Sequence, residues 1–329
     1  MNWKKKKVLV TGAGGFIGSH LVERLVKLGA TVRALVKYNS RNDWGMIEYL
    51  PVQTRKKMEI IQGDIRDAKF CREAAKNCDI VFHLAALIAI PYSYHAPESY
   101  VDTNIKGTLN IINACLENKV RKVVHTSTSE VYGTAKYVPI DENHPLQGQS
   151  PYSATKIGAD KIAESYYLSF GLPVATIRPF NTFGPRQSAR AIIPTIITQA
   201  LCSGRIKLGS LKPIRDLTYV KDTVEGFIRI AESDKTAGEV INIGTGKGVS
   251  VGELVGLIGK IIGRKIEVIC DRKRLRPPKS EVLRLICNNK KAEKLLSWKP
   301  SFSLENGIIE TKNWIEKHLD FYKSDIYNI

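Results

Sequence analysis

The first forty residues alternate between apolar runs, a glycine-rich turn and an amphipathic segment. An apolar run over residues 8–10 leads into glycines at positions 12, 15 and 18, and apolar residues then recur at helical spacing until Gly29. This order predicts a buried strand, a tight turn and a helix with a glycine stop, and a second apolar run over 31–36 predicts the next strand. Because glycine has no Cβ and a helix N-terminus favours anions, the G-x-x-G-x-x-G turn predicts a site for the phosphates of a dinucleotide.

The same alternation continues along the chain. Further strands are expected at 58–63, 79–84, 121–127 and 174–178, with long helices at 101–118 and 151–170. Regular strand–helix alternation predicts an α/β fold of the Rossmann type, a doubly wound parallel sheet that binds ligands at the carboxyl ends of its strands.

After residue 180 the pattern becomes irregular. Helices are expected at about 190–203, 251–262, 290–297 and 304–318, and short strands near residue 206 and at 239–244 and 265–269. We therefore predict a dinucleotide-binding domain over 1–180, to which a segment of about 217–250 returns. The smaller C-terminal α/β lobe, over 181–216 and 251–329, is expected to bind the substrate.

Composition narrows the class of protein further. The formal net charge is +18, but the basic residues are scattered and are not interleaved with aromatics, so no nucleic-acid partner is expected. No apolar run is long enough to span a membrane. Six cysteines without a C-x-x-C pair favour free thiols in a reducing cytoplasm, and no cluster of histidines and carboxylates indicates a metal.

Two further motifs carry candidate chemistry. Tyr152 and Lys156 are four residues apart and therefore share one face of the predicted helix. A nearby ammonium group favours the phenolate, so the tyrosine pKa is expected to fall toward the range of a general base. Thr128, Ser129 and Glu130 follow the strand at 121–127, where a parallel sheet presents its catalytic groups.

Together these motifs resemble the extended short-chain dehydrogenases/reductases of the nucleotide-sugar-modifying branch. The match covers essentially the whole chain in the family's order. It is carried by residues 11–18 (TGAGGFIG), 63–67 (GDIRD), 83–86 (HLAA), 127–133 (STSEVYG), 152–156 (YSATK), 178–186 (RPFNTFGPR) and 215–222 (RDLTYVKD).

The resemblance implies a role for individual residues. NAD(P) is expected to contact residues of the glycine turn, of the second and third strands and of the central cleft: Gly12, Gly15, Phe16, Ile17, Lys37, Asn39, Arg41, Asp64, Ile65, Leu84, Ala85, Ala86, Asn104, Tyr152, Lys156 and Phe180. The nucleotide sugar is expected to contact Thr128, Asn181, Arg186, Arg190, Arg215 and Arg276. A homodimer is also implied, because relatives pair two long helices, here 101–118 and 151–170.

The shared first step in such enzymes is oxidation of the sugar at C4, with Tyr152 as the base, Thr128 bonded to O4 and Lys156 on the nicotinamide ribose. Glu130 stands where similar 4,6-dehydratases have the base that removes the C5 proton, while Ser129 or water would assist the leaving C6 hydroxyl. The Thr-Ser-Glu triplet resembles that of the GDP-mannose dehydratases. It also occurs in UDP-glucuronate decarboxylases, and 4-epimerases usually lack the glutamate, so these two reactions stay open as alternatives. A cofactor-sensing or nucleic-acid-binding protein without catalysis is the remote alternative.

Longer stretches resemble most closely the 4,6-dehydratases that begin legionaminic-acid synthesis from a UDP- or GDP-linked N-acetylglucosamine. They lie at 38–45, 90–98, 139–145 and 187–191. One position departs from the family pattern. NAD-using relatives carry a carboxylate at the end of the second strand, where this chain has Val36, followed by Lys37, Asn39 and Arg41. These residues give a slight preference for NADP over the family's usual NAD.

Overall fold

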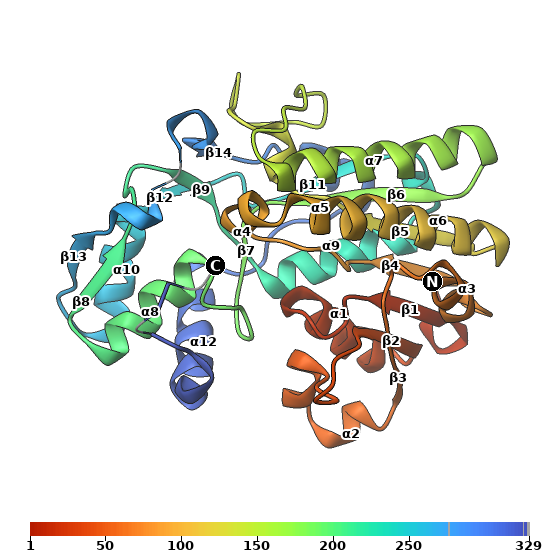
Figure 1. The fold of residues 1–329 in the computed structure, drawn as a ribbon, viewed down its shortest axis with the longest axis horizontal. Helices are drawn as coiled ribbons and strands as arrows, with labels where there is room; N and C mark the ends of the chain where they lie inside the picture. The colour runs from red at the N-terminus through yellow and green to blue at the C-terminus, as the bar shows by residue number, and fades with distance from the viewer. Residues whose placement is uncertain (276, 325, 328–329) are drawn as a thin grey trace.

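The structure is a computed structural model, and it describes residues 1–275, 277–324 and 326–327. A seven-stranded parallel sheet forms its centre, as the sequence predicted, with the strand order β11-β6-β5-β4-β1-β2-β3 (Figure 1). The strands are β1 (Lys7–Thr11), β2 (Thr31–Lys37), β3 (Met58–Gly63), β4 (Ile80–His83), β5 (Lys122–Thr126), β6 (Val174–Pro179) and β11 (Val240–Ile243). The order reverses beside β1, and such a switch point is where parallel sheets bind ligands.

Helices cover both faces of this sheet. One face carries α3 (Ala68–Ala75), α6 (Gly107–Glu117) and α7 (Pro151–Phe170), and the other carries α1 (Phe16–Lys27), α9 (Val220–Glu232) and α11 (Lys290–Leu296). Each layer buries its own apolar cluster against the sheet. Ser150 caps the N-terminus of α7 in a capping box with Ser153, and the helix ends at Gly171 in the left-handed conformation.

The predicted helix at 101–118 is divided in the structure. It begins as α5 (Pro97–Tyr100), continues through a π-helical turn over Val101–Lys106 and ends as α6. The short helix α4 (Ile90–His95) precedes it, and α2 (Val52–Arg55) lies before β3. A π-helical turn widens the helix locally, and such turns are frequent at functional sites.

A second group of elements lies at the left of Figure 1. It contains α8 (Ile192–Cys202), α10 (Val251–Ile262) and α12 (Leu304–Lys317), which pack against one another. Three small sheets accompany them: β7 (Thr182–Phe183) with β10 (Thr218–Tyr219); β8 (Arg205–Leu208) with β13 (Glu267–Cys270); and β9 (Ile214–Asp216) between β12 (Gly248–Ser250) and β14 (Arg284–Leu285). The sequence did not predict α9. It also did not predict the strands of two or three residues, because these are too short to show a period.

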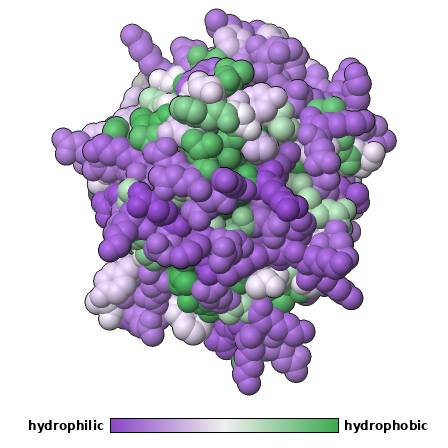
Figure 2. All heavy atoms as spheres, turned by 90° about the vertical axis from the view of Figure 1, so that its right-hand side faces the viewer, coloured by the Kyte–Doolittle hydropathy of each residue, from purple (hydrophilic) through white to green (hydrophobic). Residues whose placement is uncertain are grey.

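The surface at the right of Figure 1 is mostly hydrophilic, with a patch of hydrophobic residues in its upper half (Figure 2). At the C-terminal end of α7, on this side, Leu168 is 72% exposed and Phe170 is 59% exposed. None of the helices in the described part of the chain combines the length and hydropathy needed to cross a membrane. All six cysteines are free thiols.

Candidate active site

The glycine turn lies between β1 and α1 and lines a cavity of about 720 Å³. Gly12 has a φ of +68°, which residues with a side chain rarely adopt. Gly15 is the N-cap of α1 and has no side chain to cap the first N–H groups of the helix. A Cβ on Gly18 would lie 2.2 Å from the Gly12 carbonyl oxygen, so this glycine lets the helix approach the turn. Phe16 and Ile17 also line the cavity. The uncapped helix start therefore presents backbone N–H groups to an anion.

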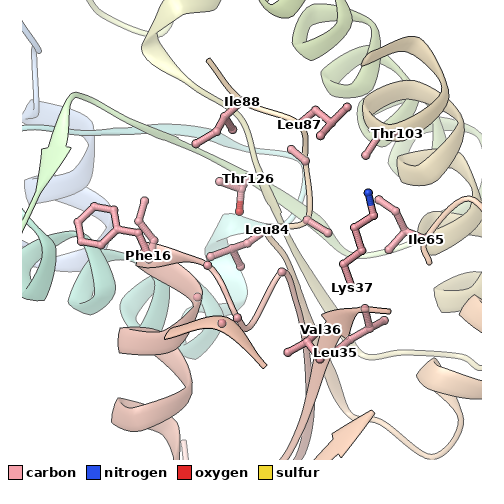
Figure 3. Close-up of a pocket in the computed structure, with 18 of the residues that line it drawn as sticks. Phe16, Leu35, Val36, Lys37, Ile65, Leu84, Leu87, Ile88, Thr103 and Thr126 are labelled. Carbon is pink, nitrogen blue, oxygen red and sulfur yellow. The ribbon is translucent and has the colours of Figure 1, made fainter. Parts of the chain in front are cut away.

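The end of β2 forms a second wall of this cavity. Lys37, Asn39 and Arg41 line it, and Figure 3 shows the Lys37 side chain extended toward Ile65 and Thr103. Asn39 shapes the loop, because its amide donates to the Asp43 carbonyl at 2.8 Å and accepts from the Asp43 N–H at 3.1 Å. The Asp43 carboxylate was not predicted, yet this residue lines the cavity as well. The wall thus carries two cations and one anion.

Asp64 and Ile65, which the resemblance implied as cofactor contacts, line the cavity at the end of β3. Arg66 binds the Asp64 carboxylate with two side-chain hydrogen bonds to Oδ2, at 3.0 and 2.6 Å. Hydrogen bonding from Arg66 lowers the pKa of Asp64 below its usual value, although partial burial opposes this. The carboxyl group is therefore ionised and held by its neighbour.

The floor of the cavity comes from the end of β4. Leu84, Ala85 and Ala86 line it, and Thr11 Oγ1 accepts the N–H groups of Leu84 and Ala85, each at 3.1 Å. His83 is buried behind them and bonds Thr11 at 2.8 Å, as expected of a core histidine rather than a metal ligand. These contacts fix the backbone on which a flat ligand ring can lie.

Asn104 does not line this cavity, contrary to the implied role. Its side chain is fully buried, accepts from the Leu87 N–H at 2.8 Å and donates to the Leu87 carbonyl at 3.0 Å and to Thr155 at 3.1 Å. Because Leu87 itself lines the cavity, Asn104 holds part of the wall from behind.

The candidate catalytic groups come together in the same cavity. Thr128, Ser129 and Glu130 lie where β5 ends, and Tyr152 and Lys156 face them from α7. Thr128 lies near the Tyr152 hydroxyl and lowers its pKa against the effect of burial. Ser129 is 2% exposed and Tyr152 is 9% exposed, so the chemistry would take place away from bulk water. A hydroxyl, a phenol and a carboxylate are therefore close enough to act on one sugar ring.

The expected fall in the Tyr152 pKa is wrong for this structure. Burial raises the pKa of the Tyr152 hydroxyl above its usual range; Thr128 opposes this, and the Glu130 charge adds to it. The Lys156 ammonium group instead donates to the Thr126 carbonyl at 2.6 Å. The i, i+4 spacing puts the two residues on one face, but it does not fix where the long lysine side chain ends.

Lys156 stands beside a buried polar cluster, which consists of His125, Ser127, Asp160 and Arg178. The Asp160 carboxylate accepts from His125 at 3.1 Å, from Ser127 at 2.7 Å and from Arg178 Nη2 at 3.0 Å. Burial lowers the pKa of Lys156 to about 8, and the Asp160 charge opposes this. Burial alone would raise the pKa of Asp160, but the His125 hydrogen bond and the Arg178 charge lower it to about 2.

A second cavity, of about 310 Å³, adjoins the first. Glu130, Asn181, Thr182 and Gln187 line both, so Glu130 stands at their junction. Three arginines, Arg190, Arg215 and Arg274, line the second cavity. Phe180, fully buried, lines the first. The two cavities therefore meet at Glu130, so ligands bound in each of them could approach one another there.

One of the predicted arginines, Arg186, is not placed there. Arg186 faces α1, where its Nη1 donates to Ser19 at 3.3 Å and its Nη2 pairs with Glu23. Its guanidinium group therefore holds the loop after β6 to α1 rather than lining the second cavity. Arg276 lies outside the described residues.

Sequence reasoning missed several lining residues of both cavities. They are Asp43, Trp44, Leu87, Ile88, Thr103, Thr182, Gln187, Arg274, Glu281 and Tyr327. Arg274 lies two residues before Arg276, which the resemblance implied as a substrate contact. Tyr327 carried no signal, because it belongs to no motif.

The residues of the first cavity fit a dinucleotide. Between the turn after β1 and the end of β2 the cavity is lined by Gly12, Gly14 and Gly15, which have no side chains. The polar loop after β2 closes this end of the cavity. Among the described residues, no group of three or more His, Cys, Asp or Glu is placed to hold a metal ion.

Comparisons with known proteins agree with this arrangement. The family model described as GDP-mannose 4,6 dehydratase matches residues 9–311. A putative UDP-glucose 4-epimerase of Methanocaldococcus jannaschii is 33% identical over 317 residues, covering 94% of this chain and 99% of that protein. A dTDP-glucose 4,6-dehydratase of Streptomyces griseus is also 33% identical and covers 96% of each chain.

A solved structure shows the same fold. The crystal structure of DesIV, a dTDP-glucose 4,6-dehydratase from Streptomyces venezuelae with NAD and TYD bound, superposes with a TM-score of 0.85 at 28% identity. The match covers 96% of this chain and 99% of the other. The chain therefore belongs to the GDP-mannose 4,6 dehydratase family of extended short-chain dehydrogenases/reductases, whose relatives include both nucleotide-sugar 4,6-dehydratases and 4-epimerases.

Proposed function

We propose that this protein is a nucleotide-sugar 4,6-dehydratase, which converts a UDP- or GDP-linked N-acetylglucosamine into the 4-keto-6-deoxy sugar. The observation that carries the proposal is the position of Glu130. This carboxylate lines both cavities, two residues after Thr128, and Thr128 and Tyr152 line the first cavity beside it. A base at this junction is what dehydration requires and what simple epimerisation does not.

The first cavity is proposed to hold NAD(P), which accepts a hydride from C4 of the sugar and returns it later. Gly12, Gly15 and the start of α1 would bind the pyrophosphate, and Lys37, Asn39 and Arg41 would surround the adenosine ribose. Lys156 would hold the nicotinamide ribose. The cations of the β2 loop favour a 2′-phosphate, whereas Asp43 would repel one, so both cofactors are to be tested.

The residues around C4 would then move one proton. Tyr152, in its ionised form, takes the proton of the O4 hydroxyl as the C4–H bond is broken, and Thr128 bonds O4. Burial raises the pKa of Tyr152, so its ionised form needs a nearby cation. Lys156 would supply that charge once its ammonium group turns from the Thr126 carbonyl toward the phenol. The buried site thus keeps the catalytic base away from bulk water.

The step after C4 oxidation would belong to Glu130. A 4-ketone acidifies the C5 proton, so the carboxylate removes it, and the C6–O bond breaks with loss of the hydroxyl. Ser129 or a water molecule donates the proton that lets this hydroxyl leave as water. The hydride would then return to C6, and Glu130 would deliver to C5 a proton that has exchanged with solvent. The proton that Tyr152 took from O4 would pass back to Ser129 or to water, which leaves a 4-keto-6-deoxy sugar and an unchanged enzyme.

The second cavity is proposed to bind the nucleotide diphosphate. Its arginines can each donate two parallel hydrogen bonds to a phosphate group. The stretches 38–45, 90–98, 139–145 and 187–191 support N-acetylglucosamine as the sugar, through their resemblance to the legionaminic-acid dehydratases.

A 4-epimerase is the second candidate. It is favoured by the Methanocaldococcus jannaschii relative, which is as similar to this chain as the Streptomyces griseus dehydratase. Both reactions begin with the same C4 oxidation by Tyr152 and Thr128. They separate afterwards, because an epimerase returns the hydride to the other face of C4 and needs no base at C5.

Product analysis tests the proposal. The protein is incubated with UDP- and GDP-linked N-acetylglucosamine in D₂O, with NAD or NADP added, and the product is examined by mass spectrometry and NMR. A dehydratase gives a product that has lost one water and carries deuterium at C5. An isomer of unchanged mass without deuterium would refute dehydration and establish the epimerase.

The matched variants are Glu130→Gln and Glu305→Gln, the latter on the exposed first turn of α12. Glu130→Gln is expected to lower dehydration by at least about 100-fold, the usual contribution of a general base. Glu305→Gln is expected to leave it unchanged. Equal turnover in both variants would remove Glu130 from the mechanism.

We further propose a homodimer that pairs α6 and α7 of two copies. The exposed Leu168 and Phe170 and the hydrophobic patch on that side of the molecule support it (Figure 2). Light scattering of the purified protein measures the mass directly.

A further inference from the structure

The chain continues beyond the part that matches the family. The family model ends at residue 311, within α12, and the described residues after this helix extend to Tyr327. The described residues of this C-terminal tail, 318–324 and 326–327, are anchored to the body of the protein. Tyr322 is buried, and its hydroxyl donates to the Gln187 carbonyl at 2.9 Å. Gln187 lines both cavities, so the anchor lies at the site.

Phe321 gives the tail a second anchor. Its ring packs edge-to-face on Tyr49, which also contacts Trp314 and His318 of the C-terminal region. Tyr49 ends the 3₁₀ turn Gly45–Tyr49, which directly follows the loop at the end of β2. The tail is therefore held on two sides before it reaches Tyr327.

Tyr327 lines the second cavity, the same one that Glu130, Arg190 and Arg215 line. The central guanidinium carbon of Arg274 lies 4.5 Å from the centre of the Tyr327 ring. Arg274 Nε also donates to Asp271 at 3.2 Å, and the Arg274 side chain is 12% exposed. A guanidinium group fixed by a carboxylate and an aromatic face has little freedom to rotate.

The backbone also holds Arg274 against the cavity. A Cβ on Gly209 would lie 2.6 Å from the Arg274 carbonyl oxygen, so the chain after β8 approaches Arg274 as closely as glycine permits. Gly209 lines the cavity too. Arg274 is thus positioned from three directions: by Gly209, by Asp271 and by Tyr327.

We propose that the C-terminal tail completes the substrate site, with Tyr327 as a positioning residue that holds the Arg274 guanidinium group for the diphosphate of the nucleotide sugar. This inference rests on the proposed function for the class of its ligand. Nε of Arg274 binds Asp271, and a bidentate phosphate contact uses the two Nη atoms. The ring orients these atoms, and no bond is made or broken by Tyr327.

The test compares Tyr327→Ala with Tyr327→Phe, which keeps the ring, and with Tyr137→Ala, which removes an exposed tyrosine elsewhere. Calorimetry measures the affinity of the cofactor-loaded protein for UDP and for GDP, and steady-state kinetics measures kcat and KM. Tyr327→Ala is expected to weaken nucleotide binding and to raise KM by about tenfold, near the upper range of a desolvated cation–π contact, with kcat unchanged. Tyr327→Phe and Tyr137→Ala are expected to match the natural protein.

A double-mutant cycle with Arg274→Ala shows whether the two residues act as a pair. If the tail acts through Arg274, the loss in the double variant equals the loss from Arg274→Ala alone. Additive losses would overturn the proposed positioning. A chain ending at Lys323 keeps the Tyr322 anchor and is expected to behave as Tyr327→Ala does, with an unchanged melting temperature.

Two negative results have different meanings. If the natural protein binds UDP or GDP and Tyr327→Ala binds it equally well, the inference about the tail is wrong while the proposed function stands. If the natural protein binds neither nucleotide, the proposed function on a UDP- or GDP-linked sugar is wrong, and the inference falls with it.

Discussion

The buried pair of Asp160 and Arg178 offers a prediction that links stability to the active site. Asp160 is on α7, one turn after Lys156, and its carboxylate joins this helix to β5 and β6 through His125, Ser127 and Arg178. Both members of the pair are only 5% exposed at their side chains. The variant Asp160→Asn keeps the shape of the side chain and removes its charge, which leaves the Arg178 charge buried without its partner.

The expected loss can be worked out in two ways. Breaking a buried ion pair by removing one partner costs about 3–5 kcal/mol. Independently, the pKa of Asp160 falls from its ordinary 3.8 to about 2, because its hydrogen bonds and nearby cations outweigh burial. At about 1.4 kcal/mol for each pKa unit, this difference corresponds to about 2 kcal/mol. We therefore expect Asp160→Asn to lower the free energy of unfolding by about 2–4 kcal/mol.

The pH dependence has a definite sign. A carboxyl group with a depressed pKa in the folded state stabilises the protein above its unfolded value, near pH 4, and this contribution is lost as the pH falls toward about 2. The difference in unfolding free energy between the natural protein and Asp160→Asn should therefore be constant at neutral pH and shrink below pH 4. Urea denaturation, followed by circular dichroism at several pH values, measures it.

The same substitution should affect Lys156. Burial lowers the pKa of Lys156 to about 8 even though the Asp160 charge raises it, so without Asp160 the pKa should fall lower. His125 and Arg178, which face Asp160 from β5 and β6, stay in place in the variant. The pH above which turnover falls should therefore move down by about one unit. Ser127→Ala, which keeps the charge, serves as the control. A loss of less than about 1 kcal/mol, or an unmoved alkaline limb, would refute the reasoning.

Three further predictions concern the cofactor and the assembly. Gly18→Ala should lower stability by about 2 kcal/mol and weaken cofactor binding, because its Cβ would lie 2.2 Å from the Gly12 carbonyl; thermal unfolding and cofactor titration measure both. Asp43→Asn should raise the affinity for NADPH relative to NADH about fivefold by removing a like charge, and an unchanged ratio in fluorescence titrations would place Asp43 away from the 2′ position. Leu168→Glu combined with Phe170→Glu should give a monomer in light scattering with unchanged unfolding, whereas an intact dimer would move the interface away from the end of α7.

Much of the sheet could be predicted from the sequence because its strands are buried on both faces. Such strands are continuous apolar runs, as in β1 and β4, and glycine or polar residues mark their ends. The smaller sheets left no comparable signal. β7, β10 and β14 have two residues each, and their pairing depends on contacts between segments far apart in the chain. The division of the chain into two domains at residue 180 stays a prediction.

The site was predictable to the extent that motifs carry it. Thr128, Glu130, Tyr152 and Lys156 lie together because strand ends and helix faces follow from local sequence. The direction of long side chains does not follow from it. Arg186 has the charge expected of a phosphate ligand, yet it is held by Glu23 of α1, a residue 163 positions earlier in the chain. Partners so distant in sequence are visible only once the fold brings them together.

The position of Glu130 explains why similarity alone does not separate the candidate reactions. A dehydratase and an epimerase share the fold, the dinucleotide cavity and the oxidation at C4. Most residues of the chain therefore have the same role in both enzymes. The outcome depends on the few groups that face C5 and C6 of the sugar after the C4 oxidation. In this chain we propose Glu130 and Ser129 for that role, and Glu130 stands where the two cavities meet. A carboxylate at that junction would be exposed to the acidified C5 proton in every turnover. For an enzyme that only inverts C4 it would be a source of elimination, so its presence there weighs toward the dehydratase.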